Sequence, residues 1–193
     1  MMSRESQNTR TRILTAALKL LETGEKTRMT DIARAAGISR QALYLHFETR
    51  ADLLIAVTRH VDELNNSDDL LAASRAATTG VARLDAYIEA WGGYIPIVYK
   101  VAKPIMAMAE TDEAARAAWN ERMAAMRHGC AAAVDALARD GRLRSEFDAE
   151  TATDILWAQL SVPTWVALTE GRGWSQADYI ARQKLIAKRL LVA

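Results

Sequence analysis

Apolar residues recur at helical spacing along most of the chain. In the first such stretch, Ile13, Ala16, Ala17, Leu20 and Leu21 fall at positions i, i+3, i+4, i+7 and i+8, the spacing of one helix face. No run of alternating apolar and polar residues is long enough to predict a β-strand. The pattern therefore predicts an all-α protein.

Glycine, serine and proline residues divide this pattern into separate helices. Gly24 and Gly37 each follow a helix, and Ser39 is placed to cap the next one. Pro96 and Pro104 restrict the helices around them, since proline lacks the backbone N–H. The expected helices are 9–23, 29–36, 39–47, 50–64, 79–101, 103–110, 112–140, 149–170 and 175–191.

Charge is distributed unevenly along the chain. Residues 1–60 hold ten Lys and Arg against six Asp and Glu, whereas residues 61–193 hold fifteen against eighteen. An anionic partner would therefore dock most easily on the N-terminal third. We expect its basic N-terminal arm, Arg4 to Arg12, to be either a solvated tail or an arm that enters a minor groove.

The chain offers little for catalysis or for a cofactor. Cys130 is the only cysteine, so neither an intramolecular disulfide nor a cysteine zinc cluster can form, and its Ala-rich surroundings indicate a buried, inert thiol. The histidines at 46, 60 and 128 lack metal-ligand spacing, and there is no nucleophile elbow or phosphate-binding loop. We therefore expect no enzyme, metal or cofactor; loss of turnover on mutating Cys130 or His128 would support the alternative of an enzyme.

No segment suggests a membrane or a secretory signal. No stretch approaches the roughly 20 apolar residues of a membrane span, and no apolar core follows the basic N-terminus. The sequence predicts a cytoplasmic protein without a membrane partner.

The helices expected at 29–36 and 39–47 are joined by a very short link. Two helices that cross steeply through such a turn need a small residue at their contact and a glycine at the reversal, and Ala33 and Gly37 meet these needs. Ile32, Ile38 and Leu43 supply an apolar wedge between them. This pattern predicts a helix-turn-helix whose second helix enters the DNA major groove.

Polar residues of this second helix suit base and phosphate contacts. Arg pairs well with guanine, Gln with adenine, and a small Ala leaves room for a thymine methyl group. Phenol, imidazole and guanidinium groups further along can reach phosphate oxygens, although Tyr44 could instead pack on the next helix and His46 could cap or pack. The predicted DNA-binding residues here are Ser39, Arg40, Gln41, Ala42, Tyr44, His46 and Arg50.

Residues 10–57 resemble the N-terminal DNA-binding domain of TetR-type transcriptional regulators. The resemblance rests on Ile32-Ala33, Ala36-Gly37-Ile38-Ser39, Leu43-Tyr44, Phe47, Arg50 and Leu53-Leu54. It implies a homodimer that binds a palindromic operator on double-stranded DNA and is released when a small-molecule effector occupies the C-terminal domain.

Two positions depart from the family's pattern. Arg28 stands where the family usually has a Ser or Thr that caps the second helix and touches phosphate, so the resemblance implies capping by Thr27 or Thr30 and a phosphate contact by Arg28. Thr27 and Arg28 therefore join the predicted DNA-binding residues. Arg50 replaces the more usual Lys and keeps the charge.

The segment NNSDD at 65–69 interrupts the helical pattern and marks a boundary. We expect a helix-turn-helix domain at 1–49, a connecting helix at 50–66 and a ligand-binding and dimerisation domain at 67–193. The predicted function is a ligand-responsive repressor; an activator, or a regulator without a small-molecule ligand, is the alternative.

Aromatic and methionine residues of the C-terminal part suggest a cavity. Such side chains at helical spacing are often plain core, but they also line apolar ligand cavities between helices. Trp157 and Trp165, eight residues apart, are expected to share one helix face. Because few charges lie among them, the ligand would be mainly apolar. The candidate lining is Trp91, Tyr94, Trp119, Met123 and Trp157.

The last two expected helices carry apolar stripes, and Pro163 is expected to kink the first of them. In the family that the chain resembles, these helices form the dimer interface; burial of both stripes within the monomer is the alternative. The predicted interface residues are Leu156, Leu160, Thr164, Ala167, Leu168, Tyr179, Ile186 and Leu190.

Overall fold

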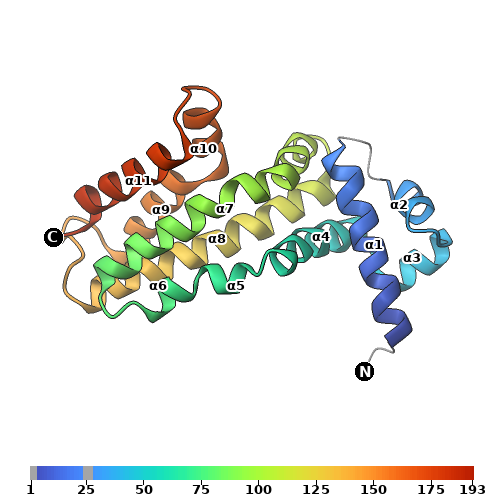
Figure 1. The fold of residues 1–193 in the computed structure, drawn as a ribbon, viewed down its shortest axis with the longest axis horizontal. Coiled ribbons are helices and arrows are strands. Elements are labelled where there is room, and N and C mark those ends of the chain that lie inside the picture. The colour runs from blue at the N-terminus through green and yellow to red at the C-terminus, as the bar shows by residue number, and fades with distance from the viewer. Residues whose placement is uncertain (1–3, 24–27) are drawn as a thin grey trace. The chain divides into compact units, whose positions relative to one another are not determined.

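The computed structural model describes residues 4–23 and 28–193, and the elements within these ranges are α-helices (Figure 1). None of these helices is both long and apolar enough to cross a bilayer. In chain order they are α1 (Arg4–Glu22), α2 (Met29–Ala35), α3 (Arg40–His46), α4 (Arg50–Leu64), α5 (Ser67–Leu70), α6 (Ala72–Ala76), α7 (Gly80–Ala109), α8 (Glu113–Arg139), α9 (Ala149–Leu160), α10 (Val162–Thr169) and α11 (Gln176–Leu191).

Helix boundaries differ from the expected ones at three places, and the short helices α5 and α6 lie in a segment where no helix was expected. The predicted N-terminal arm is part of α1, which begins at Arg4. Helix α7 runs through Pro96 and Pro104, where a break near residue 102 was expected. The helix expected at 149–170 is two helices: Ser161 ends α9, and its hydroxyl accepts a hydrogen bond from the N–H of Thr164, with Pro163 in the first turn of α10. Proline is favoured in a first turn, where its missing N–H costs nothing.

The chain divides into two compact units that share the long helices α7 and α8. The first unit, called here the N-terminal unit, comprises residues 1–65 and 98–122. The second, the C-terminal unit, comprises residues 66–97 and 123–193. Each long helix therefore supplies residues to both units.

The N-terminal unit is built on a core shared by its first four helices. Ile13 of α1, Ile32 of α2, Leu43 of α3 and Leu53 of α4 have no exposed surface, so each helix contributes an anchor. Side chains from the end of α7 and the start of α8 complete this core: Val101, Ile105, Ala115 and Ala118. Burial of each large aliphatic side chain stabilises such a core by about 1.5–3 kcal/mol.

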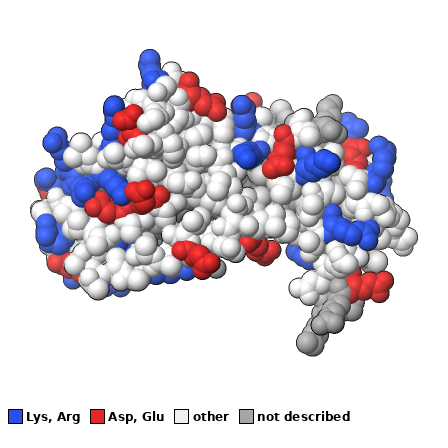
Figure 2. Space-filling model, viewed as in Figure 1, with Lys and Arg blue, Asp and Glu red and all other residues white. Residues whose placement is uncertain are grey.

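The C-terminal unit packs α7, α8, α9 and α11 around a second core. Its fully buried members include Leu84 and Ile88 of α7, Leu137 of α8, and Leu156 of α9. Figure 2 shows that the surface over the middle of α7 is uncharged, as expected from Ala90 to Tyr99, a stretch without Lys, Arg, Asp or Glu. This part of α7 offers no charge to an anionic partner.

Cys130 lies in this second core, as its sequence surroundings predict. Its thiol donates to the phenol oxygen of Tyr87 at 3.6 Å, and that phenol donates to the carbonyl of Met126 at 3.2 Å. A Cβ on Gly129 would come within 2.6 Å of the same phenol oxygen, so a glycine is needed at this contact. Burial raises the pKa of the Cys130 thiol to about 12 and raises the pKa of Tyr87 well above its ordinary value.

We predict that Cys130 resists thiol reagents in the folded protein. At pH 8 the folded thiol, whose pKa is about 12, is almost wholly neutral, whereas an unfolded cysteine with a pKa near 8.5 is partly thiolate. Labelling with a chromogenic disulfide should be slower by on the order of a thousandfold in buffer than in denaturant. The free energy that favours the neutral folded thiol is fully present below about pH 8.5 and is lost as pH rises towards 12. Stoichiometric labelling of native protein at the denatured rate would contradict this burial.

Candidate nucleic-acid interface

The turn between α2 and α3 is fixed by backbone hydrogen bonds and a cap. Gly37 has a φ of +65°, in the left-handed region that favours glycine, and the N–H of Ile38 donates to the carbonyl of Ala33 at 3.0 Å. The Ser39 hydroxyl accepts the N–H of Ala42 at 3.0 Å, capping α3 as expected. The first turn of α3 is thereby held in one position.

Two arginines of α1 hold the helix-turn-helix from behind. Arg12 donates to the carbonyl of Ala36 at 2.8 Å, and Arg10 donates to the carbonyl of His46 at 3.3 Å. The Arg10 guanidinium also lies 4.3 Å from the centre of the Phe47 ring. These two basic residues therefore have structural contacts, which differs from the solvated tail or minor-groove arm expected from sequence.

The outward residues of α3 form a mixed polar and apolar surface. Ser39, Arg40 and Gln41 are exposed, while Ala42 and His46 are half-buried. The Arg40 guanidinium lies 5.5 Å from the centre of the Tyr44 ring, so a cation–π contact orients both side chains. Tyr44 is 38% exposed.

Leu45 is a surface residue of α3 that is not among the predicted DNA-binding residues. Its side chain is 84% exposed on α3, the most exposed large apolar residue in the part of the chain that the structure describes. Helical periodicity offered a signal, because Leu43 is buried and a residue two positions later points to a different face. An exposed aliphatic group beside Gln41 suits contact with a thymine methyl group.

The start of α2 differs from the expected capping. Arg28 is itself the N-cap residue, its side chain is exposed, and it makes no capping hydrogen bond. Thr30 lies inside α2 and is therefore not its cap. Thr27 lies outside the described residues.

Arg50 begins α4 beneath this surface, and its side chain is already engaged. The guanidinium forms an ion pair with Asp112 and contacts the sulfur of Met108 at 3.5 Å. Only 20% of the side chain is exposed. A DNA phosphate that contacts Arg50 would thus bind a guanidinium that is already paired with Asp112.

Two further ion pairs join α4 to α8. Arg59 lies 2.6 Å from Glu121, and Arg122 lies 2.7 Å from Asp62. Together with the pair of Arg50 and Asp112, the residue directly before α8, these are called here the α4–α8 ion pairs. Residue numbers rise together on both helices, so α4 and α8 run in parallel. All three pairs lie within the N-terminal unit.

The predicted ligand-lining residues pack on two different cores. Trp119 packs against the core of the N-terminal unit, whereas Trp91, Met123 and Trp157 pack against that of the C-terminal unit. The buried Tyr94 meets the Trp91 ring edge to face at 6.4 Å. Trp119 therefore belongs to the N-terminal unit, and the other four residues belong to the C-terminal unit.

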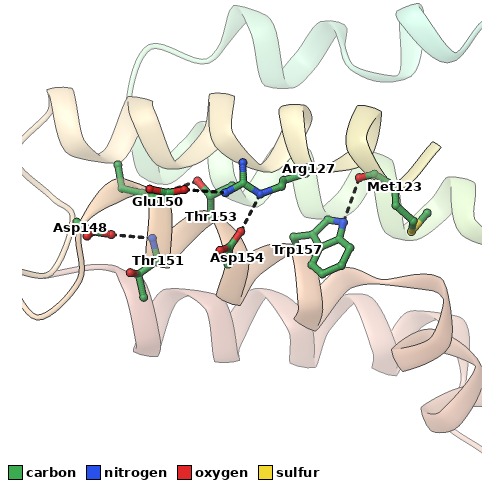
Figure 3. A network of polar contacts seen from close by, with 9 residues as sticks. Met123, Arg127, Asp148, Glu150, Thr151, Thr153, Asp154 and Trp157 are labelled. Atoms are coloured by element: carbon green, nitrogen blue, oxygen red, sulfur yellow. Dashed lines mark hydrogen bonds and ion pairs between the residues drawn. The ribbon is translucent and has the colours of Figure 1, made fainter. Parts of the chain in front are cut away.

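Contacts of the two central tryptophans hold helices together. The Trp91 indole donates to the carbonyl of Leu160 at 2.9 Å, joining α7 to α9. The Trp157 indole donates to the carbonyl of Met123 at 3.1 Å, and Arg127 donates to Asp154 at 2.7 Å, joining α8 to α9 (Figure 3). Trp165 lies on α10 instead of sharing a helix with Trp157. Indoles with satisfied N–H groups at helix contacts stabilise packing.

The predicted dimer residues fall into two groups. Leu156, Leu160 and Tyr179 have no exposed surface in the single chain, so they cannot touch a second copy, and their assignment to an interface is corrected. Ala167 is exposed, and Thr164 and Leu168 are half-buried, on α10. On α11, Ile186 and Leu190 are 39% and 41% exposed, and Leu185, which is not among the predicted interface residues, is 49% exposed.

No group of three or more His, Cys, Asp or Glu side chains in residues 4–23 and 28–193 is arranged to hold a metal ion.

The N-terminal part of the chain matches a known family of regulators. Residues 13–57 match the model of the bacterial regulatory proteins of the tetR family. The HTH-type transcriptional repressor LfrR of Mycolicibacterium smegmatis is 39% identical over 61 residues, which are 32% of this chain and 32% of that protein. The HTH-type transcriptional activator FasR of the same organism is 40% identical over 68 residues, 35% of this chain and 30% of that protein. The match thus spans about a third of the length of these relatives.

Solved structures are similar over nearly the whole chain. NalD, the secondary repressor of the MexAB-OprM multidrug efflux pump in Pseudomonas aeruginosa, matches with a TM-score of 0.70 and 25% identity, covering 98% of each chain. A protein from Saccharomonospora viridis, described as a transcriptional regulator and solved in complex with choline, matches with a TM-score of 0.72 and 21% identity, covering 97% of this chain and 99% of that one. The fold of those regulators is therefore shared across both units of this chain.

We predict that the Arg59–Glu121 pair can be reversed in sign. Arg59→Glu alone should lower the free energy of unfolding by about 1 kcal/mol, because it places two carboxylates together at a partly exposed site. Adding Glu121→Arg should recover most of the loss, measured by urea unfolding of all four combinations. Arg172→Glu, an exposed arginine of the C-terminal unit, is the matched control. Additive losses in the double variant would show that the pair contributes nothing.

Proposed function

We propose that this chain, which belongs to the TetR-type transcriptional regulators, acts as a homodimeric repressor that binds a palindromic DNA operator. A small, mainly apolar effector releases it from DNA, and its place of action is the cytoplasm. One observation carries the proposal: the capped first turn of α3 leaves Ser39, Arg40 and Gln41 exposed to solvent.

In the proposed complex, α3 lies in the major groove. Arg40 and Gln41 contact base edges, and Leu45 adds an apolar contact. Tyr44, His46, Arg28 and a shared Arg50 contact the phosphate backbone, which fixes the position of α3 on the duplex.

Two copies are needed to read a palindrome. Each would present its α3 to one half-site, with the half-sites about one helical turn, roughly 34–36 Å, apart. The exposed apolar residues Leu185, Ile186 and Leu190 of α11 support pairing through this helix, together with the α10 residues Thr164, Ala167 and Leu168. Exposed apolar patches on a soluble protein commonly mark such an interface.

Effector binding is assigned to the C-terminal unit. The similar protein from Saccharomonospora viridis, solved with choline, supports a small-molecule role for this fold. Trp91, Tyr94, Met123 and Trp157 supply an apolar and aromatic environment there. The effector acts by favouring a conformation in which the distance between the α3 helices of the two copies no longer matches the distance between the half-sites.

The direction of regulation depends on where the operator lies relative to a promoter. One matched relative is a repressor and another is an activator, so activation is the second candidate. Transcription measured in vitro from a template carrying the selected operator distinguishes the two.

The proposal is tested by selecting bound sites from random duplex DNA with purified full-length protein. We expect an enriched palindrome with half-sites one helical turn apart, and binding that weakens steeply with salt. If the protein retains no duplex from the library, the proposed function is excluded.

We predict that Arg40→Ala relaxes base preference. Loss of a bidentate base contact should cost about 1–3 kcal/mol at the matching position of each half-site and little at the others. Titration of the selected operator and its single-base variants measures this effect. Arg172→Ala, which removes an exposed guanidinium of the C-terminal unit, should leave every affinity unchanged. A uniform loss across all variants would assign Arg40 to phosphate contact.

We predict that the double variant Ile186→Glu and Leu190→Glu is monomeric. Two carboxylates on this face of α11 would be desolvated in a dimer, which is unfavourable by several kcal/mol. Sedimentation should show a dimer for the parent chain and a monomer for the variant, with helicity retained because both side chains are partly exposed. Leu70→Glu, at a leucine of similar exposure on α5, is the control and should remain dimeric. An unchanged dimer in the double variant would place the interface elsewhere.

A further inference from the structure

The N-terminal unit contains a cleft to which the proposed function gives no small-molecule ligand. Its volume is about 510 Å³, within the range typical of small-molecule sites. Three arginines from three elements line it: Arg28 at the start of α2, Arg40 on α3 and Arg50 on α4. The end of α7 and the turn before α8 close the other side. This is a concave, basic site in the same unit as the helix-turn-helix.

One carboxylate, Asp112, also lines the cleft, and both of its oxygens are engaged. One oxygen pairs with Arg50, and the other accepts the N–H of Ala115 at 3.0 Å. Its charge is thus balanced by Arg50 and by the first turn of α8. The lining described by the structure therefore has an excess of two positive charges, from Arg28 and Arg40.

The remaining walls are largely apolar. Met29 is buried and Met108 is half-buried. The Arg40 guanidinium lies 5.5 Å from the centre of the Tyr44 ring. Methionine and tyrosine side chains adapt to a flat apolar body, and arginine forks match carboxylate, sulfonate or phosphate oxygens. A compound that fits both the arginines and the apolar side chains has an acidic group attached to an aromatic or aliphatic part.

We propose that this cleft binds a small organic anion of that kind, in direct competition with DNA. The competition rests on the proposed function, because Arg28, Arg40 and Tyr44 are residues assigned there to DNA. The anion is held by the arginines, with its apolar body against Met29 and Met108. Such a compound acts without an effector in the C-terminal unit.

Naphthalene-2-sulfonate is a suitable probe, with naphthalene-2-sulfonamide as its uncharged match. Binding of each to full-length protein is measured by calorimetry at constant ionic strength. Displacement of a fluorescent random-sequence duplex is then followed by anisotropy, so no operator is required. We expect one sulfonate per chain, no measurable binding of the sulfonamide, and an apparent DNA dissociation constant that rises linearly with sulfonate without a plateau.

Two exposed positions provide matched variants. Thr111→Glu adds a carboxylate to the cleft lining, and Asn120→Glu adds one to α8 outside it. The first should weaken sulfonate binding by at least about tenfold through charge repulsion, and the second should leave it unchanged.

Several outcomes would overturn the cleft proposal. They are equal weakening in both variants, equal binding of the sulfonamide, and DNA displacement that reaches a plateau, which indicates a site elsewhere. A chain that binds the sulfonate as expected but no duplex would contradict the proposed function while leaving the anion site intact.

Discussion

The position of α3 depends on how α4 is fixed to α8. Apolar burial supplies most of the binding energy between these segments, since Leu53 and Val57 share a core with Ala115 and Ala118. The α4–α8 ion pairs add a requirement on register, because an ion pair needs its two charged groups within about 4 Å of each other. A shift of either helix would part Arg59 from Glu121 and Asp62 from Arg122 together. Charge pairing thus selects one register of a contact that burial stabilises.

Local signals were sufficient to predict the helix-turn-helix. Gly37 and Ser39 specify the turn and the cap through their own backbone and side-chain chemistry, and Leu43 lies where helical periodicity places a buried residue. The same reasoning misjudged Pro104, because packing of the long helix α7 outweighs the loss of one backbone hydrogen bond. At Pro163 the error was the opposite one: the sequence was expected to bend a helix, and Ser161 instead caps a new one.

Contacts between distant segments could not be predicted. Arg50 and Asp112 are 62 positions apart, and no periodicity links them. The tryptophans illustrate the same limit: Trp119 and Met123 lie one helical turn apart on α8, yet they pack against different cores. Likewise, Leu156 and Ile186 both fit an apolar stripe, but only the folded chain distinguishes a buried stripe from an exposed one. Composition indicates that a face is apolar, whereas the arrangement of helices decides what covers it.

Sharing α7 and α8 between the two units has a consequence for protein engineering. A fragment that ends at Asn65 retains every residue of the helix-turn-helix but loses Asp112, Glu121 and Arg122, and with them the counterions of α4. Its apolar core would also be left open where Val101, Ile105, Ala115 and Ala118 pack. A chimeric regulator that joins this helix-turn-helix to the ligand-binding domain of another protein should therefore include residues 98–122 as well. The smallest transferable unit is discontinuous in sequence, and a junction placed in the link after α4 would cut through it.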